Sequence, residues 1–184
     1  MQRQTPKWRA KTTASASGYT AHMSPAKKRT PKACRPYMPG YGIPKAKQGL
    51  LPWTWAERRL KQSHNYWIST TRPDGAPHTM VVWGLWLDGT FYFSTGANSR
   101  KGRNLAENPR CVVATEKAEE AVVVEGTATV VSDRPLLKRF ATLYVKKYKW
   151  DMSSFSEPVY AVQPHAAFGL YEKKFLGSGT RWEF

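Results

Sequence analysis

Residues 88–105, which read DGTFYFSTGANSRKGRNL, carry the pattern that decides the fold of this chain. Asp88-Gly89 predicts a tight hairpin turn, and the aromatic and β-branched run over 90–95 predicts the strand that leaves it. A short helix is expected over about 99–107, because Ser99 suits an N-cap and an asparagine–proline pair ends the helical pattern. The stretch therefore predicts a strand that passes through a small polar loop into a helix.

Two interpretations of that polar loop and its cations stay open at this point. Arg100, Lys101 and Arg103 fit the ordinary surface charges of a solvated turn. They also fit a seat for a doubly charged anion such as phosphate, because a helix N-terminus offers free backbone N–H groups and a partial positive charge. The hydroxyl of Ser99 and a neighbouring cation would add charge-assisted hydrogen bonds to such an anion.

Short strand patterns separated by turn signals make up most of the remaining folded chain. Together with 90–95, strands are expected over 66–71, 77–87, 110–116, 121–131 and 159–171. Helices are expected over 52–60 and from Asp133 onward, where an aspartate cap precedes a proline in the first turn. No strand–helix–strand repeat is visible. We therefore predict a mainly β fold with flanking helices, arranged as a six-stranded antiparallel barrel.

The formal charge of +16 is unevenly distributed over the 184 residues. Residues 1–48 hold 11 Lys or Arg and no Asp or Glu, whereas residues 49–184 hold 18 Lys or Arg and 13 Asp or Glu. A basic segment with few aliphatic residues cannot bury enough apolar surface to offset its ordering entropy. We expect a disordered basic arm over 1–39 and one folded domain over 40–184. The arm is either a non-specific leader or a tether, and we expect nucleic-acid contact only non-specifically through it.

Several kinds of site are not expected from the sequence. No run of 18 apolar residues and no secretory apolar segment is present, which favours a cytoplasmic protein without membrane contact. Cys34 and Cys111 have no metal-ligand spacing and are expected to be reduced, Cys111 as a core residue of a strand. The four histidines are scattered, so no metal site is predicted.

The order of motifs along the chain resembles the FMN-binding split-barrel family, which includes pyridoxamine 5′-phosphate oxidase and related flavin and deazaflavin oxidoreductases. The likeness covers about residues 41–184. It is carried in order by RPDGAPH at 72–78, TMVVWG at 79–84, DG at 88–89, FYFST at 91–95, SRK at 99–101 and NLAENPR at 104–110. The resemblance implies a split barrel that forms a homodimer, with the cofactor in a groove between the subunits.

The resemblance also implies which residues bind the cofactor. This chain has positions that match four cofactor-binding features of the family. They are the strand beside the ring system, the end of the next strand, the phosphate-binding hydroxyl and cations, and a C-terminal segment that nears the cofactor across the dimer. These positions are Thr79, Met80, Val81, Val82, Ser94, Thr95, Ser99, Arg100, Lys101 and Trp182. His78 is a candidate proton relay, since it precedes the ring-facing strand, and the alternative is a structural histidine. Trp83 and Trp182 are candidates for stacking on a ring.

The activity implied is that of an oxidoreductase with a tightly bound phosphorylated flavin-type cofactor, either FMN or the deazaflavin coenzyme F-420. Such a cofactor exchanges hydride or electrons with a small organic substrate, and the protein supplies placement and electrostatics. The ring-facing strand lacks the arginine and lysine of the true pyridoxamine 5′-phosphate oxidases, which favours the flavin/deazaflavin branch. The alternatives are a non-catalytic flavin carrier or sensor, and a basic protein that contacts nucleic acid.

Overall fold

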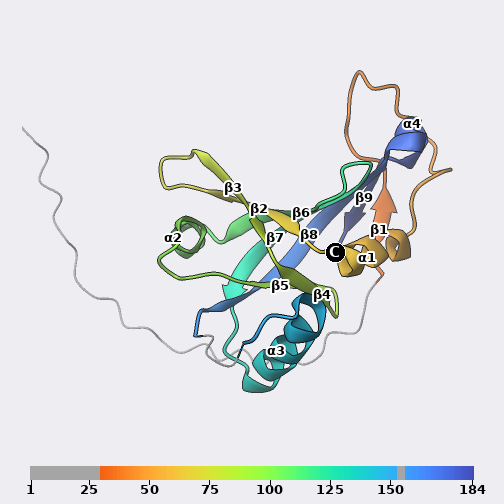
Figure 1. Cartoon of the computed structure of the whole chain (residues 1–184). Coiled ribbons are helices and arrows are strands. Elements are labelled where there is room, and N and C mark those ends of the chain that lie inside the picture. The colour runs from red at the N-terminus through yellow and green to blue at the C-terminus, as the bar shows by residue number, and fades with distance from the viewer. Residues whose placement is uncertain (1–29, 153–155) are drawn as a thin grey trace, which may run out of the picture.

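The computed structural model describes residues 30–152 and 156–184, in which one antiparallel sheet is flanked by helices (Figure 1). The strands are β1 (Lys32–Cys34), β2 (Tyr66–Thr71), β3 (Pro77–Val82), β4 (Gly84–Leu87), β5 (Thr90–Ser94), β6 (Arg110–Thr115), β7 (Glu120–Val130), β8 (Val159–Tyr171) and β9 (Thr180–Glu183). The helices are α1 (Trp53–Gln62), α2 (Arg100–Glu107), α3 (Arg134–Tyr148) and α4 (Phe175–Ser178), with a 3-10 turn η1 (Glu172–Lys174) before α4. The sheet order is β1-β9-β8-β7-β6-β2-β3, and the β4–β5 hairpin joins it where β5 pairs with β8.

The prediction of a mainly β antiparallel fold with flanking helices is confirmed, but the strand count is not. The described residues form nine strands where six are predicted, and the sheet is not closed into a barrel. The single strand expected over 77–87 is broken at Trp83, so that β3 pairs with β2 while β4 turns away to pair with β5. Gly84 permits this turn, because a Cβ at that position would overlap the ring of Phe91.

The N-terminal boundary of the fold also differs from expectation. Residues 1–29 of the basic arm lie outside the described residues. Lys32–Cys34, however, forms β1 and pairs with β9, so the expectation of disorder does not hold for this strand. A strand partner supplies there the hydrogen bonds that stabilise a segment with little apolar content.

Two apolar clusters hold the elements together. In the main core, Ile68, Val113 and Val124 lie side by side on β2, β6 and β7 and are fully buried beneath α1. The second cluster joins α3 to the β4–β5 hairpin through residues such as Phe140 and Tyr92. Each large side chain that is fully buried contributes about 1.5–3 kcal/mol to stability. The two clusters therefore fix α3 and the hairpin relative to the sheet.

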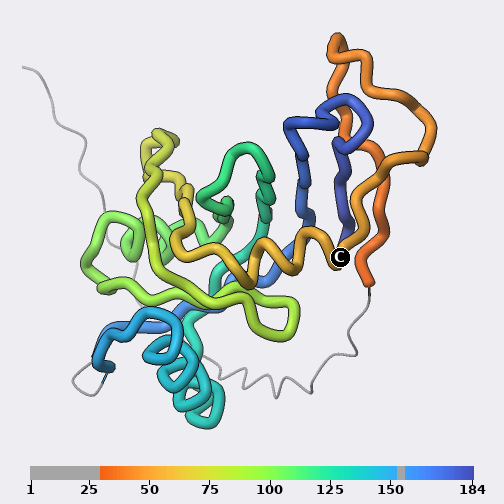
Figure 2. Tube along the Cα trace, turned by 45° about the vertical axis from the view of Figure 1, so that its right-hand side comes forward, coloured from red at the N-terminus to blue at the C-terminus, as the bar shows by residue number. Residues whose placement is uncertain are grey.

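One end of the sheet extends away from the remaining strands. There β8, β9 and β1 stand together, and the loop between β1 and α1 lies beside α4 (Figure 2). Among the described residues, no helix combines the length and the apolar character needed to cross a membrane.

Candidate functional site

A groove of about 300 Å³ lies where β3, β5, α2 and α3 meet. Its volume is at the lower end of the range typical of small-molecule sites. The groove is lined by Val81, Val82, Trp83, Ser94, Lys101 and Tyr144. The structure thus brings the end of the predicted ring-facing strand next to the strand–loop–helix stretch over residues 88–105.

The loop between β5 and α2 forms a compact corner of hydroxyl groups at the start of a helix. Ser99 is the N-cap of α2, as the sequence predicts, and its Oγ accepts a hydrogen bond from the backbone N–H of Gly102 at 3.0 Å. The Oγ1 of Thr95 lies 3.1 Å from the same Ser99 Oγ. Since the first N–H groups of a helix lack partners within it, this corner can donate hydrogen bonds to an anion.

Close backbone contacts hold that corner in shape. The N–H of Ser99 donates to the carbonyl of Gly96 at 3.0 Å, and the hydroxyl of Ser94 donates to the carbonyl of Pro158 at 2.7 Å. A Cβ on Gly102 would overlap the Gly96 carbonyl oxygen and lie 2.7 Å from that of Ala97. Only glycine fits there without a shift of the backbone, so the geometry of the loop depends on this residue.

Lys101 supplies a cation at the corner. Burial lowers the pKa of its ammonium group, because the charged form loses hydration. Within residues 30–152 and 156–184, no ion pair or hydrogen bond satisfies this ammonium group. Arg100, next to it, is exposed. A half-buried cation without a counter-charge is stabilised when an anion binds beside it.

The predicted strand beside the ring is the edge strand β3. It pairs with β2 alone, so among the described strands its outer edge keeps unpaired backbone N–H and C=O groups. Val81 and Val82 line the groove, whereas Thr79 and Met80 lie farther along the strand and are exposed. The Oγ1 of Thr79 is 2.8 Å from the Oγ of Ser69 on β2.

Trp182 and His78 lie outside the groove lining, as do the predicted site residues Thr79, Met80, Thr95, Ser99 and Arg100. Trp182 is fully buried in the main core, with its ring centroid 5.4 Å from that of Trp53. It also fills the space above Gly169, where a Cβ would lie 2.5 Å from the indole ring. His78 is half-buried on β3 and is not part of the groove lining, although its Nδ1 has no hydrogen-bond partner among the described residues.

An aromatic wall on the α3 side of the groove is only partly foreseen from the sequence. Trp83 is predicted to stack on the cofactor ring, and within the chain its indole stacks on Tyr148, with centroids 4.7 Å apart and planes at 6°. Its indole N–H donates to Asn65 Oδ1 at 3.1 Å. Tyr144 beside it belongs to a helical stripe whose pattern predicts core packing, and no sequence signal shows that one member of the stripe lines a groove.

The interruption between β3 and β4, behind this wall, is held by hydrogen bonds from the end of α3. The backbone N–H of Gly84 donates to the hydroxyl of Tyr148 at 2.8 Å, and that hydroxyl lies 2.8 Å from the carbonyls of His64 and Gly84. The Nζ of Lys147 donates to the Gly84 carbonyl and to the hydroxyl of Tyr66, each at 3.0 Å. Burial lowers the pKa of Lys147 to about 8. These bonds fix the position of Trp83.

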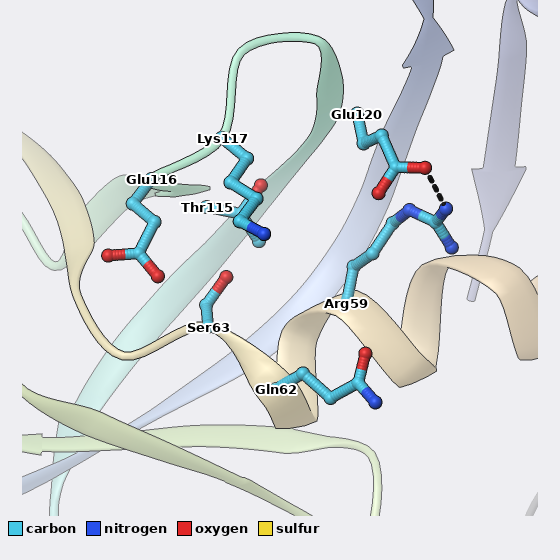
Figure 3. Close-up of a pocket in the computed structure, with 7 residues that line it drawn as sticks. All are labelled: Arg59, Gln62, Ser63, Thr115, Glu116, Lys117 and Glu120. Atoms are coloured by element: carbon cyan, nitrogen blue, oxygen red, sulfur yellow. Dashed lines mark hydrogen bonds and ion pairs between the residues drawn. The ribbon is translucent and has the colours of Figure 1, made fainter.

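A second, smaller cavity of about 70 Å³ lies between the end of α1 and the turn that joins β6 to β7 (Figure 3). Arg59 forms an ion pair with Glu120 there, and its guanidinium lies 3.6 Å from the ring centroid of Trp55. Glu116 accepts hydrogen bonds from the backbone N–H groups of His64 and Asn65 at 2.8 and 3.1 Å. Although burial acts to raise the pKa of Glu116, these bonds lower it overall. Glu116 and Glu120 therefore join the end of α1 to the turn between β6 and β7.

Neither cavity contains a metal-binding arrangement. Over the part of the chain that the structure describes, no group of three or more His, Cys, Asp or Glu is placed to hold a metal ion. The chemistry available at the groove is therefore that of hydroxyls, free N–H groups, a cation and an aromatic wall.

Comparison with known proteins finds a family whose members this chain resembles in sequence. A family model described as pyridoxamine 5′-phosphate oxidase matches residues 55–171. A pyridoxine/pyridoxamine 5′-phosphate oxidase of Bacteroides thetaiotaomicron is 33% identical over 118 residues, which are 62% of this chain and 53% of that protein. The match thus spans about half the length of this curated relative.

Solved structures show a similar fold. A conserved hypothetical protein of Mycobacterium tuberculosis superposes with a TM-score of 0.61 at 20% identity, covering 67% of this chain and 87% of that chain. An F420 reductase superposes with a TM-score of 0.51 at 21% identity, covering 60% of this chain and 94% of the reductase. At these identities the likeness concerns the fold alone.

Proposed function

The chain belongs to the pyridoxamine 5′-phosphate oxidase family, and from this premise we propose that it is an oxidoreductase with a phosphorylated flavin-type cofactor. The family match confirms the resemblance drawn from the sequence. The cofactor, FMN or alternatively coenzyme F-420, exchanges hydride or electrons with a small organic substrate. The observation that carries the proposal is Lys101, a half-buried cation without a counter-charge in the described chain, beside the hydroxyls at the start of α2.

The residues that line the groove, together with those at the adjoining start of α2, fit such a cofactor. Ser99, Thr95 and the first N–H groups of α2 can donate hydrogen bonds to a phosphate, while Lys101 and Arg100 balance its charge. The free edge of β3 offers backbone donors and acceptors for the polar rim of a ring system. When bound, the cofactor supplies the redox chemistry, and the chain binds the oxyanion, orients the ring and excludes water with Trp83 and Tyr144.

We further propose that the protein is a homodimer. In-register pairing aligns one residue from each of seven strands on the sheet face opposite the main core. This exposed row consists of Cys34, Arg181, Phe168, Val123, Ala114, Trp67 and Val81. None of the seven is fully buried, and Trp67 and Val81 are 45% and 43% exposed. An extended apolar surface of this kind is typical of an interface.

Cys34 and Cys111 form no disulfide, which supports the proposal of a cytoplasmic location.

The test is to identify what copurifies with the protein from a host that makes both FMN and coenzyme F-420. We expect denaturation to release one of the two, recognised by mass spectrometry, at close to one equivalent per chain. A protein that carries neither and binds neither at saturating concentration contradicts the proposal. Reduction of the bound cofactor, followed by reoxidation that depends on an added organic substrate, distinguishes an enzyme from a carrier.

A further inference from the structure

The loop over residues 35–50, here called the tyrosine loop, exposes two aromatic side chains at the extended end of the sheet. Tyr37 is 92% exposed and Tyr41 is 58% exposed. In the described chain, the one ring near either of them is Phe175, whose centroid is 6.0 Å from that of Tyr41. Two large exposed aromatic side chains on one loop offer apolar surface that a partner can cover.

The tyrosine loop is held firmly in spite of this exposure. Arg35 donates hydrogen bonds to four backbone carbonyls, those of Ala46, Gln48, Gly177 and Gly179, at 2.6–3.0 Å. Gly49 has a φ of +86° and packs so closely that a Cβ would lie 2.8 Å from the Gly177 carbonyl oxygen. Both ends of the loop are therefore fixed, so it forms a platform whose ordering costs less entropy on binding.

The exposed row connects this platform to the groove. One end of the row is Cys34 on β1, directly before the tyrosine loop, and the other end is Val81 on β3, which also lines the groove. Symmetric dimers pair the same surface on both subunits. A two-fold axis parallel to the strands reverses the row, so that the β1 end of one copy lies over the β3 end of the other.

The shape of the chain favours this reversed arrangement. The tyrosine loop stands at the end of the sheet that extends beyond the other strands, while α2 lies at the opposite end (Figures 1 and 2). In a reversed pair, each extension lies along the body of the partner and covers Trp67 and Val81, the most exposed members of the row. The loop has cations but no acidic residue, so it does not repel a phosphate-bearing ligand.

This inference rests on the proposed function. We propose that the tyrosine loop of one copy covers the groove of its partner, where Tyr37 and Tyr41 complete the binding site in trans. With Trp83 and Tyr144 on one side and two phenol rings on the other, the completed site suits a planar ring, for the cofactor and for an aromatic or heteroaromatic substrate.

The decisive experiment is complementation between two defective variants. One is the double variant Tyr37→Ala/Tyr41→Ala, and the other is Lys101→Ala. Each is expected to bind FMN or coenzyme F-420, titrated separately by fluorescence, about tenfold or more weakly than the wild type. When both are coexpressed with different tags and the mixed dimer is purified, one of its two sites combines the intact Lys101 with the intact loop. We expect this dimer to bind half an equivalent of cofactor per chain, which is one molecule per dimer, with wild-type affinity.

The other outcomes separate the inference from the function on which it rests. A mixed dimer without a tight site overturns the inference, because the loop then acts on its own subunit. So does a tyrosine variant that binds cofactor like the wild type, and so does a wild type that sediments as a monomer. If the wild type binds neither cofactor, the proposed function itself fails. Val130→Ala, which shortens an exposed apolar side chain outside the row, is the matched control and should leave binding unchanged.

Tyrosine and lysine at an exposed edge also fit a polyanion such as single-stranded nucleic acid. Binding of a labelled oligonucleotide that is lost in the tyrosine variant, with cofactor affinity unchanged, would assign the loop to that partner and overturn the inference. Because Tyr37 is almost fully exposed and Tyr41 is more than half exposed, the double variant should keep its thermal midpoint within about 2 °C of the wild type. Weaker cofactor binding then reflects a lost contact and not a damaged fold.

Discussion

The groove and the small cavity both contain cations, but they differ in how those charges are satisfied. In the small cavity, Arg59 pairs with Glu120 and stacks on Trp55 (Figure 3). In the groove, Lys101 has no partner within the described chain, and burial lowers its pKa. Charge pairs that are complete within the chain stabilise the fold, whereas a desolvated cation left alone costs stability until an anion binds.

The difference assigns separate roles to the two regions. The small cavity joins α1 to the turn between β6 and β7, and its loss should affect unfolding. The groove corner is prepared for an oxyanion from outside the chain, and its loss should affect binding. The variants below test this separation, beginning with the largest expected effect.

Gly102→Ala should have the largest effect, because a Cβ there overlaps the Gly96 carbonyl and must displace the corner. We expect a loss of stability of about 2–3 kcal/mol and cofactor binding that is weaker by about 100-fold or more, since the hydroxyls and free N–H groups move together. Urea unfolding and fluorescence titration measure the two effects. Gly177→Ala, where a Cβ meets nothing within 4 Å, is the control and should behave like the wild type. Retained affinity in Gly102→Ala would contradict a preformed corner.

Lys101→Ala should weaken cofactor binding without weakening the fold. A charge-assisted hydrogen bond contributes about 1.5–3 kcal/mol, so we expect affinity to fall roughly ten- to a hundredfold. The midpoint of thermal unfolding should stay the same or rise slightly, because a desolvated charge is removed. Lys117→Ala, on the rim of the small cavity, serves as the matched lysine control. If Lys101→Ala binds both FMN and coenzyme F-420 as tightly as the wild type does, the oxyanion seat is disproved.

Arg59→Met should show the opposite behaviour. It breaks the ion pair with Glu120 and removes the guanidinium that stacks on Trp55, so we expect a loss of about 1–2 kcal/mol in the free energy of unfolding. Cofactor affinity should not change. Lys61→Met, which removes an exposed helical pair with Glu57, should cost less than about 0.5 kcal/mol. An Arg59→Met protein of full stability but reduced cofactor affinity would reverse the roles assigned to the two cavities.

Local signals predict the corner from the sequence better than the groove as a whole. The Ser99 cap and the Asp133 cap both depend on chemistry within four residues, and both are present as predicted. The break at Trp83 is not predictable in this way, because it depends on how Gly84 packs against Phe91 on the next strand. The side chain of Tyr144 belongs to a stripe that looks like core, and its place in the groove follows from the packing of α3 on the hairpin.

The same contrast applies at the two ends of the sheet. Low apolar content predicts disorder around residue 33, yet the strand there is stabilised by pairing with residues about 150 positions away along the chain. The resemblance predicts Trp182 near the cofactor across the dimer, and this stays a prediction; within the chain, its ring packs on that of Trp53 in the core. Partners distant in sequence decide both cases, and a local pattern contains no information about them.

The smallest expected effect concerns Lys147, which lies between the two regions: it donates to Gly84 behind the groove wall and is influenced by the charge of Glu116. Burial lowers its pKa from 10.5 to about 8, so between these values the unfolded chain holds a proton that the folded chain has released. The contribution of Lys147 to stability should therefore rise as the pH increases through 8, by about 1 kcal/mol up to pH 9.5 once partial exposure is allowed for. Burial also raises the pKa of Cys111 from 9.0 to about 12 and raises the pKa of Tyr66 and Tyr148. Ionisation of these groups in the unfolded chain, from about pH 9 for the thiol and pH 10 for the phenols, opposes folding equally in the wild type and in Lys147→Met. Urea unfolding of the wild type and Lys147→Met at pH 7 and 9.5 measures the difference, and an equal pH dependence in the two proteins would show that the buried ammonium carries no such penalty.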